Sequence, residues 1–456
     1  MIDQHKSTTS RRDFLKTTGA FAAASMVPLR MSDPPVHVAE NNTLQLALIG
    51  CGGRGSGAVV NAIEANNGPV KLVAMADVFE ERVTRSYTAL SEEHSPYLAV
   101  PEDQKFIGFD AYKKAMDCLS PGDIAILATP PAFRWVHFTY AIEKGLNVFM
   151  EKPVTVDGPT TRRMFDLARQ ASAKNLKVGV GLMVRHCRGR QALHERIRNG
   201  EIGDIIAMRG YRMREDGNGF IGPNPGSIND LLYQVKHFHS FLWASGGMFS
   251  DFYIHQIDEL SWMKGAWPVE ARGVGGRHYR GDNIDQNFDT YAVEYTYADG
   301  AKLFFNGRNM PSCEESFASF VHGSIGCGVV STRGHTPGRV CTFRGQTFSE
   351  AARIWAFPQP ERSPYVLEWV DLLEAIREDK PYNEVKRGAE ASLVTSMGRM
   401  AAHTGQAITY DQILNSDHEF APNLDKLMMD SPAPLALNQD GRYPIPQPGL
   451  ITTREY

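Results

Sequence analysis

Apolar residues come in short, nearly unbroken runs between residues 44 and 182, and amphipathic stretches separate these runs. Such apolar runs are typical of strands that are buried on both faces of a parallel sheet. Helical patterns of apolar positions occupy 133–144 and about 158–175. The alternation predicts a doubly wound parallel sheet with strands at 44–49, 71–76, 123–129, 147–150 and 177–182.

The second half of the chain has a different pattern, in which strand-like stretches are joined by turns. Ala298-Asp299-Gly300 separates two of these stretches and is typical of a hairpin. Strands joined by hairpins form an antiparallel sheet. We expect such strands at 205–212, 269–277, 290–297 and 302–307. Two closing helices are expected at about 365–378 and about 387–404.

Two segments have compositions that are typical of loops. Residues 216–228 are rich in Gly, Asn and Pro, which favours a loop or lid over a substrate. The chain from residue 411 onward is Pro-rich and mostly without periodicity. We expect it to form an extended arm over its own or a neighbouring subunit.

The N-terminal residues resemble a twin-arginine export signal. Ser10-Arg11-Arg12-Asp13-Phe14-Leu15-Lys16 matches the S-R-R-x-F-L-K pattern at every position. The moderately apolar stretch that follows, 17–27, is far shorter than the ~20 residues that span a bilayer. The resemblance implies export to the periplasm without a stable membrane anchor, by a route that carries folded proteins with their cofactors bound.

Composition and charge exclude several function classes. The 456 residues include 48 Lys and Arg against 52 Asp and Glu, a net charge of −4. This balance lacks the basic surface of a nucleic-acid-binding protein or a polybasic membrane-surface protein. A chain of this length can bury a large core without disulfides. Cys313, Cys327 and Cys341 could pair in an oxidising compartment, and the sequence leaves that open.

A glycine-rich turn follows the first predicted strand directly. Gly50, Gly52 and Gly55 have the G-x-G-x-x-G spacing and lead into a helical stretch. These glycines allow a tight turn, a close approach to a pyrophosphate and close packing of the helix on the strand. Asp77 ends the second strand, where a carboxylate accepts hydrogen bonds from the adenosine ribose. The carboxylate favours NAD over NADP, although the nearby Arg82 keeps NADP as an alternative.

Further candidate residues lie at the ends of the third and fourth apolar runs. Ligands of doubly wound sheets bind beyond the carboxyl ends of the strands, where Thr129 and Lys152 are expected with Gly50 and Asp77. A partly desolvated lysine beside a cationic nicotinamide should have a lowered pKa, which suits Lys152 to share a hydroxyl proton. A cis peptide bond before Pro153 is compatible with this turn.

A third candidate group lies on a helix expected at about 249–263. Asp251 and His255 are four residues apart and therefore share one helix face. A carboxylate beside an imidazole fixes the tautomer and stabilises the imidazolium, as a general base requires. We expect His255 to accept the substrate hydroxyl proton. The weaker alternatives are a structural histidine, or a metal site in which His237 and His239 join His255; the expected chemistry requires no metal.

These motifs together resemble the Gfo/Idh/MocA family, named after glucose–fructose oxidoreductase, inositol dehydrogenase and a rhizopine-catabolism protein. The resemblance is carried by 50–55, 128–130, Glu-Lys-Pro at 151–153, and Gly246-Gly247 with Asp251, His255 and Asp258. It implies an α/β protein: an N-terminal Rossmann doubly wound parallel sheet and a C-terminal α+β domain with an open, mostly antiparallel sheet. The family commonly uses that sheet as an oligomer interface, which implies a homodimer or homotetramer.

The resemblance and the spacing together assign the candidate residues. The predicted catalytic group is Lys152, Asp251 and His255, with Asp258 as a helix-orienting carboxylate. The predicted cofactor-binding residues are Gly50, Gly52, Gly53, Arg54, Gly55, Asp77, Thr129, Pro130, His137, Glu151 and Lys152. The weaker substrate candidates are Arg185, His186, Trp243 and Tyr253. The predicted segments are a signal and linker at 1–42, the Rossmann domain at 43–176, the α+β domain at 177–410 and the arm at 411–456.

Three functions are compatible with these residues. The first is an exported NAD(P)-dependent oxidoreductase that moves hydride to or from a hydroxyl carbon of a sugar, cyclitol or glycoside, with a tightly held cofactor. The second is an NAD-dependent glycosidase that oxidises its sugar transiently, with Tyr253 or His255 as base. The third is a sugar-binding protein that has lost the chemistry. Identifying any nucleotide released on denaturation would settle most of what the sequence leaves open.

Overall fold

The computed structural model describes residues 42–214, 219–278 and 280–456. The predicted signal segment therefore lies outside the described residues, except for Asn42, and so do residues 216–218 of the predicted loop. In the described part of the chain, no helix combines the length and the apolar character needed to cross a bilayer.

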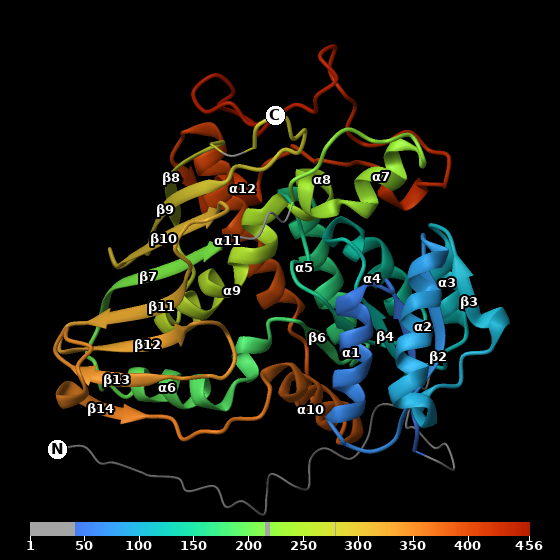
Figure 1. Ribbon diagram of the computed structural model, residues 1–456. Coiled ribbons are helices and arrows are strands. Elements are labelled where there is room, and N and C mark those ends of the chain that lie inside the picture. Colours follow the sequence, from blue (N-terminus) through green and yellow to red (C-terminus); the bar gives the residue numbers. More distant parts are fainter. Residues whose placement is uncertain (1–41, 215–218, 279) are drawn as a thin grey trace, which may run out of the picture. The chain divides into compact units, whose positions relative to one another are not determined.

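The first half forms the predicted parallel sheet. Its six strands lie in the order β3 (Lys105–Ile107), β2 (Val70–Asp77), β1 (Leu44–Ile49), β4 (Ile124–Leu127), β5 (Asn147–Met150) and β6 (Val178–Val180). All of the pairings are parallel. The connections contain α1 (Gly53–Glu64), α2 (Glu80–His94), α3 (Ala111–Asp117), α4 (Arg134–Glu143) and α5 (Gly158–Ala173), as Figure 1 shows.

Two details differ from the expectation for this half. Strand β6 pairs with β5, so the sheet continues past the predicted domain boundary at residue 176. The short strand β3 lies at the sheet edge and has no long apolar run to mark it. Because an edge strand is buried less than a central one, its sequence need not be apolar throughout.

The second half forms a nine-stranded, mostly antiparallel sheet, as predicted. Its order is β14 (Arg353–Ala356), β13 (Cys341–Arg344), β12 (Gly326–Thr332), β11 (Ser316–Gly323), β7 (Ile205–Arg214), β10 (Lys302–Asn309), β9 (Thr290–Thr296), β8 (Glu270–Gly276) and β15 (Ile408–Thr409). The β10–β7 pairing is parallel, and the predicted hairpin joins β9 to β10. Strands β11 to β15 were not predicted. Gly, Ser and Cys interrupt the apolar pattern of β11 and β12.

Helices separate this sheet from the first half of the chain. Helix α9 (Gly247–Lys264) packs on β7 and β11, and α11 (Val385–Thr404) contacts β8, α9 and α5 (Figure 1). Other helices are α6 (Arg188–Arg198), α7 (Asp230–Lys236), α8 (Leu242–Ser245), α10 (Pro364–Arg377) and α12 (Tyr410–Leu414). Helix α9 is buried on nearly all sides, because the sheet and α11 cover different faces of it.

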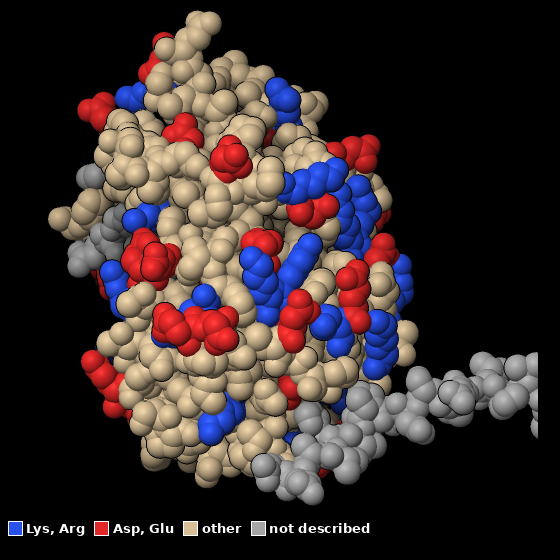
Figure 2. Space-filling model, turned by 90° about the vertical axis from the view of Figure 1, so that its right-hand side faces the viewer, with Lys and Arg blue, Asp and Glu red and all other residues tan. Residues whose placement is uncertain are grey.

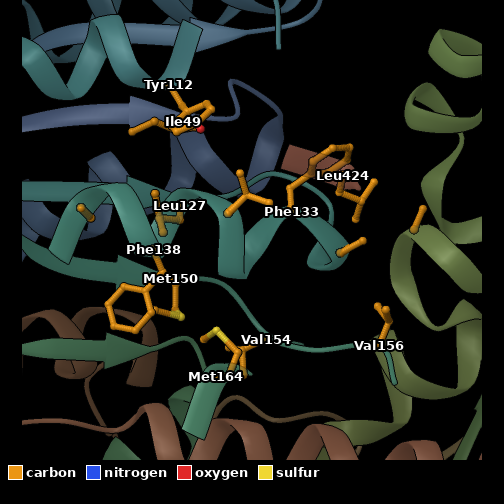
Figure 3. Close-up of a cluster of buried hydrophobic side chains, with 14 of the residues drawn as sticks. Ile49, Tyr112, Leu127, Phe133, Phe138, Met150, Val154, Val156, Met164 and Leu424 are labelled. Atoms are coloured by element: carbon orange, nitrogen blue, oxygen red, sulfur yellow. The ribbon is translucent and has the colours of Figure 1, made fainter. Parts of the chain in front are cut away.

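Capping and core packing fix the strand ends of the first half. Helix α5 begins with a capping box in which Asp157 and Thr160 satisfy each other's backbone N–H groups. Figure 3 shows buried side chains of β1, β4 and β5, including Ile49, Leu127 and Met150, in one cluster. Packing in this cluster holds the strands rigidly, so the loops at their carboxyl ends have fixed positions.

The C-terminal arm packs on its own chain. Leu424, from the short 3₁₀ turn at Leu424–Lys426, lies beside Phe133 in Figure 3. The Glu455 carboxylate is buried near the very end of the chain. The arm therefore contributes core contacts to its own fold, which is one of the two placements that the sequence left open.

The surface charge agrees with the composition. On the face shown in Figure 2, Lys and Arg side chains are interspersed with Asp and Glu side chains. All six cysteines lie in the described part of the chain, and none of them forms a disulfide. The pairing of Cys313, Cys327 and Cys341 that the sequence left open is therefore not found.

Candidate active site

A cavity of about 570 Å³ opens at the carboxyl ends of the parallel strands. The loops that follow β1, β2, β4 and β5 form one side of it. Residues from the turn after α7 and from the first turns of α9 form another side. The cavity therefore collects residues from both halves of the chain, at the edge where doubly wound sheets bind ligands.

The glycine turn has the local geometry that a dinucleotide requires. Gly50 has a φ of +97°, and a Cβ there would lie 2.6 Å from the carbonyl carbon of Ala128. A Cβ on Gly55 would lie 2.0 Å from the Gly50 oxygen. At Gly52 and Gly53, by contrast, a Cβ would have no neighbour within 4 Å. The first and last glycines thus permit close packing, and the middle ones leave open space at the start of α1, where N–H groups can bind phosphates.

Asp77 is positioned at the end of β2 and holds the glycine turn. Its carboxylate accepts hydrogen bonds from the backbone N–H groups of Cys51 (2.7 Å) and Phe79 (3.1 Å). Burial raises the pKa of Asp77, and these two hydrogen bonds oppose that shift. Arg82 and Arg85 line the same part of the cavity. The residues therefore fit an adenosine ribose, and the arginines keep a 2′-phosphate as an alternative ligand.

The loop after β4 is fixed by buried polar groups. The Arg134 guanidinium donates to the carbonyl oxygens of Leu127 (2.7 Å) and Thr129 (3.0 Å). The Thr129 hydroxyl lies 3.2 Å from Nδ1 of His137. Burial, together with the charge of Arg134, lowers the pKa of His137 to about 3. His137 is thus a neutral ring in the cavity wall, and it packs against Tyr112 at a centroid distance of 4.4 Å.

Glu-Lys-Pro at 151–153 directs two side chains to different partners. The Glu151 carboxylate accepts a hydrogen bond from the Arg54 guanidinium at 2.7 Å, which ties the loop after β5 to helix α1. The Lys152–Pro153 peptide bond is cis. Lys152 lines the cavity, and its Nζ donates to the Asp251 backbone oxygen (2.6 Å) and to Asp251 Oδ1 (3.2 Å). Lys152 and Asp251, which are 99 residues apart, thus meet as predicted.

The imidazole beside Asp251 is a different one from that expected. His239, from the 3₁₀ turn at Phe238–Ser240, places Nε2 at 2.8 Å from Asp251 Oδ2. Burial raises the pKa of Asp251, but Lys152 and His239 outweigh it and hold that pKa well below its usual value. Asp251 is therefore an ionised carboxylate that joins a lysine and a histidine on the cavity wall.

His255 lies next to this group but does not pair with Asp251. Its side chain is buried, and its ring lies 4.5 Å from that of His335. Its Nδ1 has no hydrogen-bond partner among the residues that the structure describes. Burial is the main cause that lowers its pKa far below the usual value, and His335 and Lys152 add to the shift. The expected Asp251–His255 contact is wrong, because Asp251 is occupied by Lys152 and His239 from other elements.

The four weaker substrate candidates are occupied by internal contacts. Arg185 forms a bidentate ion pair with the fully buried Asp258, at distances down to 2.6 Å. His186 lies between Asp371 (2.7 Å) and Glu384 (3.2 Å). None of the four candidates, Arg185, His186, Trp243 and Tyr253, lines the described cavity.

The two aromatic candidates are buried in the core. Trp243 is fully buried, and its indole N–H donates to the Gln234 side-chain oxygen at 2.7 Å. Tyr253 packs among Phe249, Tyr291 and Phe305. Their proximity to the motif in sequence did not predict the direction of their side chains, because successive residues of a helix face different sides.

Sequence reasoning missed several residues of the cavity wall. His239 was considered only as a metal ligand, and the structure shows no group of three or more metal-binding side chains among the described residues. Phe252, Tyr112 and Arg85 also line the cavity. For Phe252, the sequence signal was its position directly after Asp251. For His239, the only sequence signal was the His-x-His pair that it forms with His237.

Comparison with known proteins shows the family of this chain. Residues 44–182 match the family model of an oxidoreductase family with an NAD-binding Rossmann fold, and residues 190–327 match the Gfo/Idh/MocA C-terminal domain. The chain belongs to the Gfo/Idh/MocA family. Residues 8–28 match the signal sequence of the twin-arginine translocation pathway, which confirms the predicted export signal. The NAD-binding match supports a nicotinamide cofactor and does not distinguish NAD from NADP.

Curated relatives within the family are distant. An inositol 2-dehydrogenase of Corynebacterium glutamicum is 21% identical over 233 residues, which are 51% of this chain and 57% of that protein. The rhizopine catabolism protein MocA of Rhizobium meliloti is 22% identical over 45% of this chain and 58% of that protein. The chain thus matches somewhat more than half the length of these relatives.

Solved structures of similar fold cover most of the chain. An aldose–aldose oxidoreductase from Caulobacter crescentus has a TM-score of 0.62 and 16% identity, over 80% of this chain and 99% of that one. A levoglucosan dehydrogenase has a TM-score of 0.61 and 18% identity, over 81% and 99%. These likenesses confirm the predicted two-part fold of the Gfo/Idh/MocA family.

Proposed function

We propose that the protein is an exported NAD(P)-dependent oxidoreductase that transfers hydride to or from a hydroxyl carbon of a sugar, cyclitol or glycoside. The observation that carries the proposal is the position of Lys152 and Asp251, which line the same cavity as the glycine turn. The family's relatives named inositol 2-dehydrogenase and levoglucosan dehydrogenase support a carbohydrate substrate.

The residues of the chain divide the work of such a reaction. When bound, a nicotinamide dinucleotide supplies a two-electron hydride acceptor or donor. Gly52 and Gly53 leave room for its pyrophosphate, and Asp77 offers carboxylate oxygens to its ribose. An ammonium has three donor hydrogens, and Lys152 uses its Nζ on two oxygens of Asp251. The remaining hydrogen is available to a substrate hydroxyl or carbonyl oxygen, whose negative charge it stabilises.

Three further features complete this proposal. We infer periplasmic residence and a tightly bound cofactor, because an exported enzyme has no access to cytoplasmic NAD turnover.

We also infer a homo-oligomer formed through the nine-stranded sheet, where Val274 and Phe304 expose 70% and 42% of their surface. Sedimentation as a monomer would contradict the oligomer.

Tyr253, one of the bases named for a glycosidase, is buried outside the cavity wall, so we favour the dehydrogenase.

One experiment tests the proposed function directly. The purified protein is denatured, the released nucleotide is identified, and the native protein is assayed for nicotinamide reduction with a panel of aldoses, inositols and anhydrosugars. We expect NAD or NADP to be released and at least one polyol to be oxidised. Absence of any nicotinamide nucleotide, both as purified and after incubation with NAD and NADP, would overturn the proposal. Cleavage of glycosides without net NADH formation would favour the glycosidase instead.

A further inference from the structure

Arg134 is a buried cation in the cavity wall that has no carboxylate partner. It is the first residue of α4, its side chain is fully buried, and it lines the cavity. Its guanidinium donates to the backbone oxygens of Leu127 and Thr129 and forms no ion pair within the described ranges of the chain. Its Nε has no hydrogen-bond partner in those ranges. Burial lowers the pKa of Arg134 to about 10, which leaves it a cation at neutral pH.

This position is unfavourable for a cation as long as the cavity holds no ligand. Burial of a charge without a counter-charge is costly. The N-terminal end of a helix carries a partial positive charge, so a cation at the start of α4 adds to that cost. The two backbone oxygens that accept from Arg134 offer only partial negative charge. The residue therefore disfavours any bound group that brings further positive charge.

Arg134 lies at the end of the cavity where we propose hydride transfer. The charges of Glu151 and Asp251 act on its guanidinium and partly oppose the effect of burial on its pKa. Both carboxylates already have cationic partners, because Glu151 pairs with Arg54 at 2.7 Å and Asp251 pairs with Lys152 at 3.2 Å. The charge of Arg134 is therefore left in surplus.

The other titratable groups at this end of the cavity do not remove the surplus. Burial lowers the pKa of His137 to about 3, so its ring is neutral. Burial and the neighbouring Glu151 raise the pKa of Glu368 well above its usual value, so that carboxyl group is neutral as well. Protonation of His239 would only add positive charge. The reaction end of the cavity thus keeps a net positive charge.

We propose that the buried charge of Arg134 biases the bound nicotinamide dinucleotide toward its reduced form; this inference rests on the proposed function. The oxidised nicotinamide ring carries a positive charge and the reduced ring carries none, whereas the rest of the dinucleotide has the same charge in both forms. A fixed cation near the ring therefore repels one form and not the other. Because Arg134 directs its hydrogen bonds at protein carbonyl groups, it acts on the ring through its charge and not by contact.

The bias adds no chemical step to the proposed reaction. Hydride still moves between the substrate carbon and the nicotinamide, and no bond to Arg134 forms or breaks. A dinucleotide that is held more tightly in its reduced form accepts hydride more readily, so the bias favours oxidation of the polyol. It equally opposes the return of hydride, so a second substrate that reoxidises the bound dinucleotide must be a stronger oxidant.

The first test uses the wild-type protein and requires no substrate turnover. The full-length protein, loaded with NAD or NADP, is titrated in the presence of redox mediators, and the absorbance of the reduced nicotinamide gives the midpoint potential of the bound couple. We expect the reduced form to be favoured about tenfold relative to the free dinucleotide, a rise of about 30 mV for two electrons. A bound couple at or below the potential of the free dinucleotide would overturn the inference.

Three variants then assign the effect to the charge. Arg134→Met removes the charge and should shift the equilibrium about tenfold toward the oxidised form. Arg134→Lys keeps a charge but loses the planar fork that donates to Leu127 and Thr129, and it should keep the wild-type potential. Arg85→Met is the matched control, because Arg85 lines the part of the cavity beside Asp77, where both redox forms have the same charge. It should weaken the binding of both forms alike and leave the potential unchanged.

A purely structural role of Arg134 leads to a different result, because a displaced loop weakens the binding of both redox forms to the same extent. Arg134→Met with the wild-type potential, or Arg134→Lys with the potential of Arg134→Met, would therefore contradict the proposal. Arg134→Gln takes the place of Arg134→Met if that variant does not fold. Failure of the proposed function is a separate outcome, in which the wild type binds no nicotinamide nucleotide in either redox form.

Discussion

Two parts of the molecule contain the same three kinds of group, one cation, one carboxylate and one imidazole. At the cavity, Asp251 joins Lys152 and His239. At the end of the chain, Glu455 joins Arg399 at 2.8 and 2.9 Å and His403 at 2.8 Å. We call these the cavity triad and the terminal triad. Their composition is alike, but their surroundings differ.

In the terminal triad, every side-chain nitrogen of Arg399 and His403 has a protein partner. Arg399 also donates to the Gly246 oxygen, the Ser250 hydroxyl and the Val156 oxygen, and the other nitrogen of His403 lies 2.9 Å from the Tyr291 hydroxyl. The space beside Arg399 and Glu455 amounts to about 10 Å³. Every partner is protein, so this triad stabilises the fold and fastens the arm to the start of α9.

The cavity triad, in contrast, faces about 570 Å³ of space. Lys152 retains a donor, and His239 retains a nitrogen, that no described protein group occupies. Unused donors and acceptors at a cavity wall can bind a ligand. The same trio of side chains can therefore face open space or be enclosed by protein partners, and no local pattern encodes which of the two occurs.

The largest expected effect comes from breaking the cavity triad at its cation. Lys152→Met should lower kcat/KM by about 10³-fold, roughly 4 kcal/mol of transition-state stabilisation, while nucleotide content and the urea midpoint change little. Lys144→Met is the control, because Lys144 forms an ion pair with Asp117 in a solvent-accessible position. Steady-state kinetics decide the result. A loss of less than tenfold in Lys152→Met would place the chemistry elsewhere.

Breaking the terminal triad should have the opposite signature. Glu455→Ala leaves the buried Arg399 without its carboxylate, which typically costs about 3–5 kcal/mol of unfolding free energy. Glu455→Gln retains an acceptor and should cost less. Urea unfolding measures both, and kcat per folded molecule should stay close to the wild-type value. A large fall in kcat with unchanged stability would show that the two triads are not separate in function.

The smallest effect concerns the buried imidazole of His186, which lies between two carboxylates. Burial opposes its charged form, but Glu384 and Asp371 outweigh burial and raise the pKa of His186 to about 9 from an ordinary value of 6.5. The proton therefore stabilises the fold fully below about pH 6.5, and this contribution is lost as the pH rises through about 9. The difference corresponds to about 3 kcal/mol. Urea unfolding between pH 6 and 10 should show the loss, and His186→Gln should abolish it.

Local patterns were sufficient for the parallel half of the fold. The runs at 44–49 and 147–150 became strands, because strands buried on both faces must be apolar throughout. Gly50 and Gly55 were identified correctly, since the lack of a side chain is a local requirement of the turn. The five unpredicted strands of the second sheet are short or rich in Gly, Ser and Cys, so their stability comes from pairing with neighbours far along the chain.

In the candidate site, too, local patterns identified some residues, and only the packing of the whole chain determined the contacts of others. The sequence by itself determined the export signal, the glycine turn, Asp77 at the end of its strand and the two residues Lys152 and Asp251, because each occupies a recognisable place in a local pattern. Only the tertiary structure decided that His239 and not His255 faces Asp251, and that Arg185, His186, Trp243 and Tyr253 point into internal contacts. The physical reason is that the partner of a side chain depends on which distant segments pack around its element. Helical spacing allows Asp251 and His255 to lie on one face of their helix, but the packing of the whole chain determines which imidazole contacts Asp251.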